Sequence, residues 1–386
     1  MSSFPPVPPL EPVAPAEPIS AADPETPHDS ALPPPFVPAL EPAFQAEPAP
    51  VLPPFPPSPF DPVPTLEELP AILAHLQNEV AQVVVGQSIA VEAIFIALLS
   101  RGHCLIVGVP GLAKTLLVKV ISHLLDLHFS RVQFTPDLMP SDITGTEILE
   151  EDATTGHRRF VFVPGPIFTQ VLLADEINRT PPKTQAALLE AMQEKTVTIA
   201  GKFYAMHEPF LVLATQNPIE QEGTYPLPEA QLDRFLFELP ISYPSFEDEL
   251  LLVERHSFTP TQNLRPLISQ EQILALRDAV AKVPAPPNVI DYAVRIVRAT
   301  RTDDPTAPDY IKRWLRWGAS PRASQYLILA GRARAALHGR FNVSCEDVAA
   351  LAPLVLRHRV IRSFHADADG KSTEQIVQQL LKDISA

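Results

Sequence analysis

The segment Gly108-Val109-Pro110-Gly111-Leu112-Ala113-Lys114-Thr115 decides how this chain folds. It follows a short apolar run, residues 105–107, and an apolar pattern of helical spacing begins directly behind it at Leu116. A strand, a glycine loop, a Lys-Thr pair and a helix form a phosphate-binding loop, whose backbone N–H groups and helix N-terminus point at an anion. We therefore expect Lys114 to reach the β- and γ-phosphates of a nucleotide, and the Thr115 hydroxyl to ligate Mg²⁺.

The loop departs from the common pattern G-x-x-x-x-G-K-[ST] at one position, because Ala113 replaces the second glycine. Alanine fits the right-handed start of a helix but does not tolerate a positive φ. The loop is therefore expected only if Ala113 already belongs to the helix. Taken alone, the motif also fits a plain glycine turn between strand and helix, with Lys114 in solvent.

Length and composition limit the class of protein. The chain has 386 residues, enough for two ordinary domains and a tail, and its 46% apolar content suits a soluble globular protein. The net charge of -15 argues against nucleic-acid binding, which needs clustered Lys and Arg. The two cysteines, Cys104 and Cys345, form no metal or disulfide motif and indicate a reducing compartment. Without a long apolar stretch or a basic leader, we expect a cytoplasmic protein with no membrane span.

The first 65 residues differ from the rest of the chain. They hold half of the chain's 46 prolines, several Asp and Glu residues, and no Gly, Lys or Arg. Such a composition favours polyproline II and prevents helix and sheet ladders. Residues 1–65 are therefore predicted to be a disordered acidic arm, which serves either as a spacer or as a docking segment for a partner.

From Leu66 onward the pattern predicts an α/β nucleotide-binding core over residues 66–243. Short apolar strands alternate with helical segments, which indicates a parallel sheet covered on both faces. Two stretches, residues 144–163 and 196–204, instead have the pattern of inserted β-hairpins. The expected helices at the start are residues 66–83 and 90–100, and the expected sheet strands are residues 104–107, 132–134, 171–174, 210–214 and 235–239.

After Pro244 the strand pattern stops and helical patterns continue to residue 384. Ser344 with Asp347, and Ser372 with Gln375, have the spacing of capping boxes that begin helices. The sequence therefore predicts a small all-helical lid domain over residues 244–386.

Two carboxylates, Asp175 and Glu176, directly follow the apolar strand 171–174. The carboxyl end of a buried parallel strand is where open α/β folds bind ligands. Asp175 is suited to hold the Mg²⁺ that Thr115 ligates, largely through water. Glu176 is suited to orient or deprotonate a water that attacks the γ-phosphate. The alternative is a pair of solvated acids at a strand end.

Two later polar residues also have two interpretations each. Asn217 follows the strand 210–214 and is either a turn former or the amide that positions the attacking water. Arg234 is either a local salt-bridge partner of Asp233 or Glu229, or an arginine finger facing the γ-phosphate of a neighbouring subunit. Sequence spacing does not choose between these last two roles.

Arg322 begins a helix in the segment 318–323. A cation is unfavourable at the positive end of a helix dipole, which favours a phosphate contact over an ordinary first-turn arginine. Such a contact would couple the position of the lid to the nucleotide state.

With these residues in this order, the chain resembles the MoxR-type AAA+ ATPases over about residues 66–386. The runs 135–145 and 217–235 are highly specific to that family. The family's own loop reads G-x-P-G-x-A-K-T, and Ala113 agrees with it. The segments that match are 108–115 as Walker A, 171–178 as Walker B, 214–218 as sensor 1 and 318–323 as sensor 2.

The resemblance implies a Mg²⁺-dependent ATPase that forms a homo-hexameric ring with ATP at the subunit interfaces. Arg234 would then act on a neighbour's ATP, and Arg322 on its own or a neighbour's. The two hairpins match insertions that face the pore or the surface of the ring. The implied catalytic residues are Glu176, Asn217, Arg234 and Arg322, and the implied nucleotide-binding residues are Val85, Gly86 and Gln87 near the adenine, the loop 108–115, Leu116 and Asp175.

The resemblance also implies partners. Members of the family are thought to work as chaperones with von Willebrand factor A-domain proteins, and to mature, activate or insert metal cofactors into client proteins. We expect such a partner here, with a client that the sequence does not name. A different class of function is also compatible with the residues, namely an ATP-gated oligomeric binding scaffold with negligible turnover. A nucleic-acid motor is a third, against which the acidic charge argues.

Overall fold

The computed structural model describes residues 60, 64–151, 157–219, 223–254 and 264–385. The predicted arm, residues 1–65, lies outside the described residues except for Phe60, Pro64 and Thr65. The described residues belong to one compact unit, Phe55–Ala386. None of the helices in the described ranges is long and apolar enough to cross a membrane.

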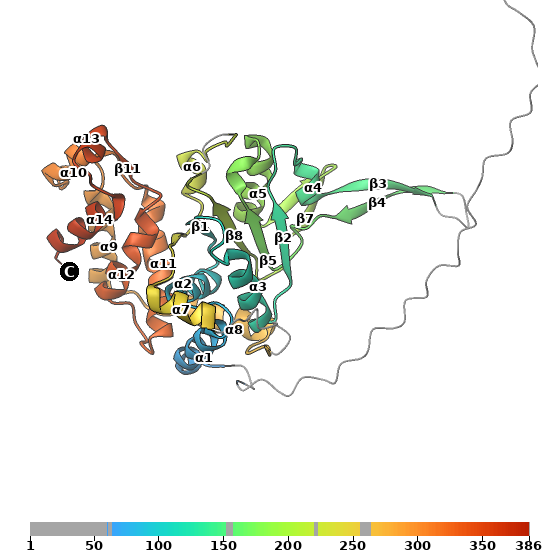
Figure 1. The fold of residues 1–386 in the computed structure, drawn as a ribbon, viewed down its shortest axis with the longest axis horizontal. Coiled ribbons are helices and arrows are strands. Elements are labelled where there is room, and N and C mark those ends of the chain that lie inside the picture. Colours follow the sequence, from blue (N-terminus) through green and yellow to red (C-terminus); the bar gives the residue numbers. More distant parts are fainter. Residues whose placement is uncertain (1–59, 61–63, 152–156, 220–222, 255–263, 386) are drawn as a thin grey trace, which may run out of the picture. The chain divides into compact units, whose positions relative to one another are not determined.

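A parallel sheet of five strands forms the centre of the nucleotide-binding core, in the order β2-β5-β8-β1-β9 (Figure 1). The strand carrying the phosphate loop, β1, lies between β8 and β9. This arrangement confirms the predicted α/β class. The strands are β1 (Cys104–Gly108), β2 (Phe129–Gln133), β5 (Val171–Asp175), β8 (Leu211–Gln216) and β9 (Phe237–Ile241).

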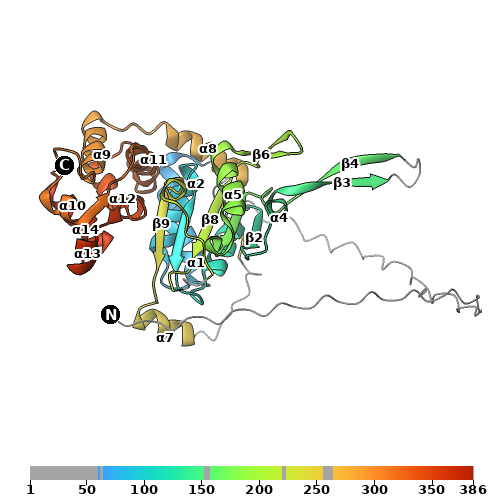
Figure 2. The same ribbon diagram turned by 90° about the horizontal axis from the view of Figure 1, so that it is seen from above.

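Alternate residues of the strands enter two separate hydrophobic clusters, one on each face of the sheet. Ile106, for example, packs in the cluster with the first three α-helices, whereas Leu105 packs in the cluster with Leu188 and Leu189 of α5. This alternation follows from the two-residue period of a strand. Both faces are therefore covered, as Figure 2 shows. The core helices are η1 (Leu66–Glu68), α1 (Leu69–Ala81), α2 (Ser88–Leu99), α3 (Lys114–Leu124), α4 (Pro140–Thr144), η2 (Ile177–Arg179), α5 (Pro182–Glu194) and α6 (Glu229–Leu232).

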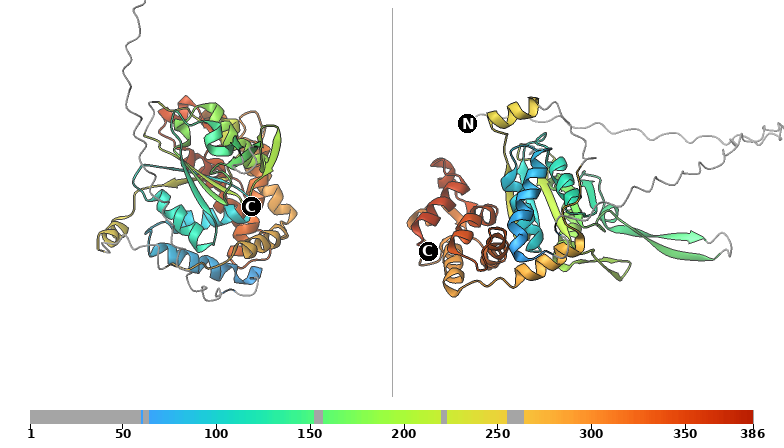
Figure 3. Two further views of the ribbon diagram at one scale, coloured as in Figure 1. Left: turned by 90° about the vertical axis from the view of Figure 1, so that its right-hand side faces the viewer. Right: turned by 90° about the horizontal axis from the view of Figure 1, so that it is seen from below.

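Both predicted hairpins are confirmed. β3 (Gly145–Glu151) pairs antiparallel with β4 (Arg158–Pro164), and β6 (Thr196–Ile199) pairs with β7 (Lys202–Ala205). The expected turn of the first hairpin, 154–156, lies outside the described residues. The two hairpins contact each other through a 2.8 Å ion pair between Lys202 and Glu147. Figure 3 shows β3 and β4 extending away from the sheet.

The chain after residue 244 is mainly helical, as predicted, and both capping boxes are present at Ser344 and Ser372. The boundary between these helices and the core, placed at residue 244 from the sequence, stays a prediction.

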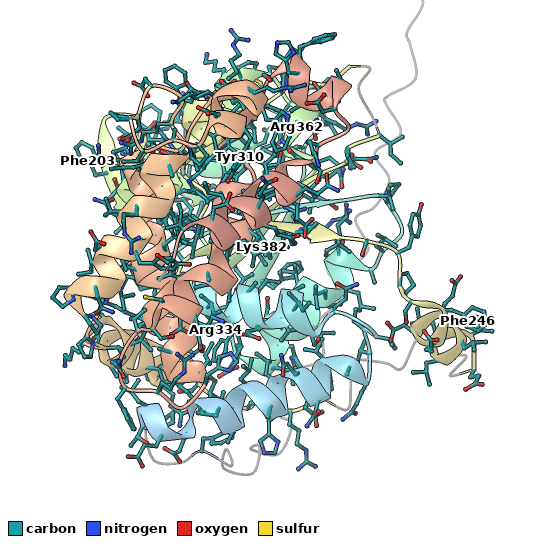
Figure 4. The ribbon with its side chains drawn as sticks, turned by 90° about the vertical axis from the view of Figure 1, so that its left-hand side faces the viewer. Phe203, Phe246, Tyr310, Arg334, Arg362 and Lys382 are labelled. Carbon is teal, nitrogen blue, oxygen red and sulfur yellow. The ribbon has the colours of Figure 1, made fainter. Side chains whose placement is uncertain are left out.

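Exposed aromatic side chains include Phe246 on α7 and Phe203 on β7, both labelled in Figure 4. The helices are α7 (Phe246–Glu254), α8 (Gln270–Ala281), α9 (Pro287–Ala299), α10 (Asp309–Trp314), α11 (Pro321–Leu337), α12 (Cys345–Leu356), α13 (Phe364–Ala368) and α14 (Thr373–Asp383).

One detail of the helical prediction is wrong, because strands do not stop at Pro244. β10 (Leu315–Trp317) pairs antiparallel with β11 (Ile361–Arg362) in a small two-stranded sheet. Strands of three and two residues are too short to show the alternation on which a strand prediction depends.

Candidate active site

The loop 108–115 joins β1 to α3, and Lys114 and Thr115 are the first two residues of that helix. The Lys114 Nζ donates a 2.6 Å hydrogen bond to the Gly108 carbonyl oxygen, across the loop. Partial burial lowers the pKa of Lys114, while the charges of Asp175 and Glu176 act in the opposite direction. The lysine lines the same cavity as the two predicted carboxylates.

The prediction that Ala113 belongs to the helix is wrong. Ala113 precedes α3 as its N-cap and has φ 54° and ψ 23°, in the left-handed region. Gly111 has a positive φ as well, of 86°. A left-handed backbone costs a non-glycine residue about 1–2 kcal/mol, and such strain is typical of ligand-binding loops, where it aims successive N–H groups into a concave anion site.

The Asp175 carboxylate ends β5 and is held on both oxygens. Its Oδ1 accepts a 2.6 Å hydrogen bond from the Thr215 hydroxyl. Its Oδ2 accepts from Arg131 Nε at 3.1 Å and Nη2 at 2.7 Å. The guanidinium of Arg131 thus supplies a positive charge to this carboxylate.

Glu176 follows in a left-handed conformation, with φ 57°. Its backbone N–H donates to the Thr215 hydroxyl at 2.8 Å. Its Oε2 accepts from Gln133 Nε2 at 2.8 Å and from Arg179 Nη1 at 3.1 Å. The side chain is therefore anchored from β2 and from η2.

Lys114, Asp175 and Glu176 line one cavity of about 480 Å³. Asn217 also lines it, and its Oδ1 accepts a 3.2 Å hydrogen bond from the Ile219 N–H, as a turn former does. Both interpretations of Asn217 therefore remain compatible with the geometry. The lining residues are Pro110, Gly111, Ala113, Lys114, Thr115, Leu116, Arg131, Gln133, Asp175, Glu176 and Asn217.

A second cavity, of about 540 Å³, adjoins the first and shares Gly111, Ala113 and Leu116 with it. Its lining is largely aliphatic and includes Val85 and Gln87, two of the three residues expected near an adenine. A polar cavity beside an apolar one suits a ligand with a charged end and a flat, apolar end. The remaining lining residues are Val83, Val84, Leu112, Pro244, Leu252 and Val253.

Gly86, the third expected adenine residue, has a structural reason to be glycine. Its φ is +77°, and a Cβ placed there would lie 2.7 Å from the Asp248 Oδ2 of α7. That oxygen accepts a 3.0 Å hydrogen bond from the Ser245 hydroxyl at the start of α7. Gly86 therefore lets α7 approach the apolar cavity, which α7 lines with Leu252 and Val253.

We predict that Gly86→Ala weakens binding of a fluorescent ATP analogue by about fivefold, roughly 1 kcal/mol. The methyl group forces the Asp248 carboxylate to move, and this disturbs its hydrogen bond with Ser245 at the start of α7. Gly201→Ala is the matched control, because Gly201 has φ +78° but no atom within 4 Å of the new Cβ. Equal affinities of the two variants, measured by fluorescence titration, would show that the contact with α7 does not matter.

Arg234 and Arg322 lie together but outside the cavity that holds Lys114. Both line a third cavity of about 200 Å³, with Arg101 and Lys195 among its other residues. Arg234 Nη1 donates to the Leu189 carbonyl oxygen of α5 at 2.7 Å. Within the described residues, the local salt bridge considered for Arg234 is not formed.

Asp233, one of the two partners considered for that salt bridge, pairs with other arginines. Its Oδ1 lies 2.8 Å from Arg359 Nε, and its Oδ2 lies 3.8 Å from Arg322 Nη1. Arg322 thus has a carboxylate beside it at the helix start, which offsets the unfavourable helix dipole.

Sequence reasoning missed several residues of the site. Arg131 and Gln133 are two apart on β2, so they lie on the same face of the strand next to β5. Two polar residues with this spacing on a strand beside Asp175 were a usable signal. Thr215 directly follows the predicted strand 210–214, which was a similar signal. The α7 residues gave no such signal, because their place depends on tertiary packing.

A phosphate loop after β1, two acids at the end of β5 in the same parallel sheet and a helical second part together define a P-loop protein of the AAA+ class. The model of the "ATPase family associated with various cellular activities (AAA)" matches residues 103–237, and the "AAA lid domain" matches residues 310–380. The chain belongs to the MoxR family of AAA+ ATPases.

The membership rests on relatives that align over most of their length. The chaperone MoxR1 of Mycobacterium tuberculosis is 45% identical over 307 residues, 80% of each chain. The protein MoxR of Methylorubrum extorquens is 33% identical over 303 residues, 74% of this chain and 87% of its own. A crystal structure of a Cytophaga hutchinsonii protein superposes with a TM-score of 0.76 at 40% identity, covering 83% of this chain and 96% of its own.

Proposed function

We propose that this protein hydrolyses ATP in a Mg²⁺-dependent reaction and uses the energy to remodel, activate or load cofactors into client proteins. The observation that carries the proposal is the single cavity lined by Lys114, Thr115, Asp175, Glu176 and Asn217, which come from three separate segments of the chain. Bound nucleotide is implied by the family, and hydrolysis is the step that these side chains support chemically.

The cavities fit the implied ligands. The aliphatic cavity suits an adenine, and the polar one suits the phosphates, with the Lys114 ammonium beside them. The Thr115 hydroxyl and the Asp175 carboxylate are hard oxygen donors of the kind that Mg²⁺ prefers. The 2.7 Å ion pair with Arg131 supports a negatively charged Asp175 carboxylate, which is the form that a metal ion needs. When bound, Mg²⁺ would supply charge neutralisation on the phosphate oxygens.

The chain's own groups then have separate roles. The loop N–H groups and Lys114 bind the phosphates. Glu176, anchored by Gln133 and Arg179, orients the attacking water and takes its proton. The side-chain amide of Asn217 positions the same water.

We infer that Arg234 and Arg322 complete the site of a neighbouring subunit. Both line a cavity distinct from the one that contains Lys114, so in this conformation neither lies at its own subunit's phosphate site. An arginine supplied in trans stabilises the charge that develops during phosphoryl transfer. This role requires an assembly in which each subunit presents the Arg234 face to the next, and a closed ring satisfies it. A hexamer is the size that the family resemblance implies.

The proposed biological role is based on the relatives. MoxR1 of M. tuberculosis is named a chaperone, which supports a chaperone-like role here. A von Willebrand factor A-domain partner, a client protein and a cytoplasmic location belong to the same proposal.

The test is phosphate release by the purified protein with ATP, measured with Mg²⁺ and with excess EDTA. We expect steady turnover with Mg²⁺ and none with EDTA, because the metal provides the charge neutralisation. ATP-dependent oligomerisation without phosphate release would contradict the proposal and support the binding scaffold instead.

A further inference from the structure

The Arg359 guanidinium, which follows α12, is buried around the segment that contains Arg234. Its side chain is 1% exposed. Its Nε donates to Asp233 Oδ1 at 2.8 Å, and its Nη2 donates to the carbonyl oxygens of Asp233, at 3.0 Å, and Phe235. Its Nη1 donates to the carbonyl oxygens of Leu236, at 3.3 Å, and Val355. All five N–H groups of the guanidinium are thus used, and four of these bonds go to residues 233–236.

No other side chain can replace this arrangement, because only arginine has five donors in a fixed plane. Burial lowers the pKa of Arg359, and the Asp233 carboxylate counteracts that effect. The neighbouring His358 also has its pKa lowered well below the usual value, by burial first and then by the Arg359 charge. A neutral histidine therefore lies beside a charged arginine. Arg359 and Asp233 form a buried ion pair. Removing either residue leaves the other charge unpaired, which strongly destabilises the contact between them.

The other Asp233 oxygen connects the same segment to α11. Oδ2 accepts a 2.9 Å hydrogen bond from the Ser320 hydroxyl, which is the N-cap of α11. The Tyr326 hydroxyl of α11 donates to the Arg234 carbonyl oxygen at 3.1 Å. The Arg359 guanidinium in turn lies over the Tyr326 ring, 5.0 Å from its centroid.

The backbone on both sides of Arg234 is therefore held by side chains of the part that matches the AAA lid domain. The Arg234 side chain itself contacts α5 through one hydrogen bond to Leu189. A segment fixed at its backbone with a lightly held side chain is suited to present that side chain to another molecule.

We propose that Arg359, Asp233, Ser320 and Tyr326 form a lid clamp that positions Arg234 for action on the neighbouring subunit's ATP. The proposal rests on the proposed role of Arg234 in trans. The lid clamp connects both the Arg234 segment and Arg322 to the lid, since Asp233 also faces Arg322. A lid movement in one subunit then changes the hydrolysis rate in the next, which is a coupling between sites.

The experiment uses Asp233→Asn and Arg359→Gln in the full-length protein. Asp233→Asn keeps the size of the side chain and every backbone acceptor, so it preserves the fold best. Arg357→Gln is the matched control, because Arg357 lies two residues before Arg359 and forms a 2.8 Å ion pair with the half-exposed Glu374. Each variant is assayed for ATP hydrolysis and for affinity toward a fluorescent ATP analogue.

We expect ATP hydrolysis by Asp233→Asn and Arg359→Gln to fall by about 10²-fold, because a displacement of ~1 Å at a reacting group costs that much. Affinity for the ATP analogue should stay within about twofold, since the lid clamp lies outside the Lys114 cavity. Arg357→Gln should keep wild-type hydrolysis. Affinity and hydrolysis lost in parallel, as in an unfolded variant, would show that these residues only hold the fold and would overturn the proposal.

A mixing experiment separates the lid clamp from a purely structural role. Subunits of Asp233→Asn retain their own Glu176, and subunits of Glu176→Gln retain an intact Arg234. Mixed oligomers should therefore regain hydrolysis, because one variant supplies the water-activating site and the other supplies the positioned arginine. The same mixture made with Arg234→Ala tests the role of Arg234 alone. Recovery with Arg234→Ala but not with Asp233→Asn would overturn the lid clamp and leave the proposed function intact, and failure of both would overturn the role in trans.

Discussion

Replacement of Glu176 by Gln is expected to lower ATP hydrolysis by about 10²–10⁴-fold, the usual contribution of a positioned general base. The amide keeps the size of the side chain and the acceptor for Gln133 and Arg179, but it does not take a proton from water. Binding of the ATP analogue should be unchanged, because Lys114 and the loop are intact. The measurements are phosphate release and fluorescence titration on the same preparation.

The control for this variant is Glu67→Gln. Glu67 is an exposed acid in the short helix η1, distant in sequence from the site residues. The control variant removes the same charge and should hydrolyse ATP at the wild-type rate. If Glu176→Gln hydrolysed ATP as fast as Glu67→Gln, Glu176 would not be the base. The inactive variant held in ATP should also retain bound client and partner in a pull-down. Failure to enrich any von Willebrand A-domain protein would count against that partner.

Replacement of Arg234 by Ala is expected to reduce hydrolysis by about 10³–10⁵-fold, the range measured for arginine fingers in GTPases. The reason is that the alanine variant cannot stabilise the charge developing on a neighbour's γ-phosphate. Affinity for the ATP analogue should change little, since Arg234 does not line the cavity of Lys114.

The matched control is Arg332→Ala on α11. Arg332 donates one hydrogen bond to a backbone carbonyl, that of Ala281 at 2.9 Å, just as Arg234 donates to that of Leu189 at 2.7 Å. Both substitutions thus remove one arginine and one such bond. Comparable hydrolysis by the two variants would mean that Arg234 has only a local structural role.

The centre of the sheet was predictable because β1, β5 and β8 are almost entirely buried and therefore read as continuous apolar runs. β2 begins at Phe129 rather than at residue 132, because this edge strand carries the polar Ser130 and Arg131. The predicted start of the last strand at residue 235 was early by two residues, since β9 begins at Phe237.

The candidate site was partly predictable for a related reason. Lys114, Thr115, Asp175 and Glu176 directly follow recognisable strands, so their position at one edge of the sheet follows from topology. The backbone conformation of Ala113 was predicted wrongly, because the general preference of alanine for negative φ does not include the strain that a phosphate loop tolerates.

The contacts that surround Arg234 could not be predicted, because Asp233 and Arg359 are 126 residues apart and meet only through the packing of α12 against β9. No hydrophobic period or helix-capping pattern in the local sequence indicates such a pair. Likewise, Leu252 and Val253 gave only a helical pattern, and their place beside the apolar cavity depends on the approach of α7 to Gly86.

The most direct test of a shared active site is ATP hydrolysis by mixed oligomers of Arg234→Ala and Glu176→Gln. Each protein alone should be nearly inactive. In an equal mixture that exchanges subunits, about a quarter of the interfaces would pair an intact Glu176 with an intact Arg234 from the next subunit. We expect hydrolysis to return to a comparable fraction, about a quarter, of the wild-type rate. A mixture no more active than the sum of its two separate components would contradict it.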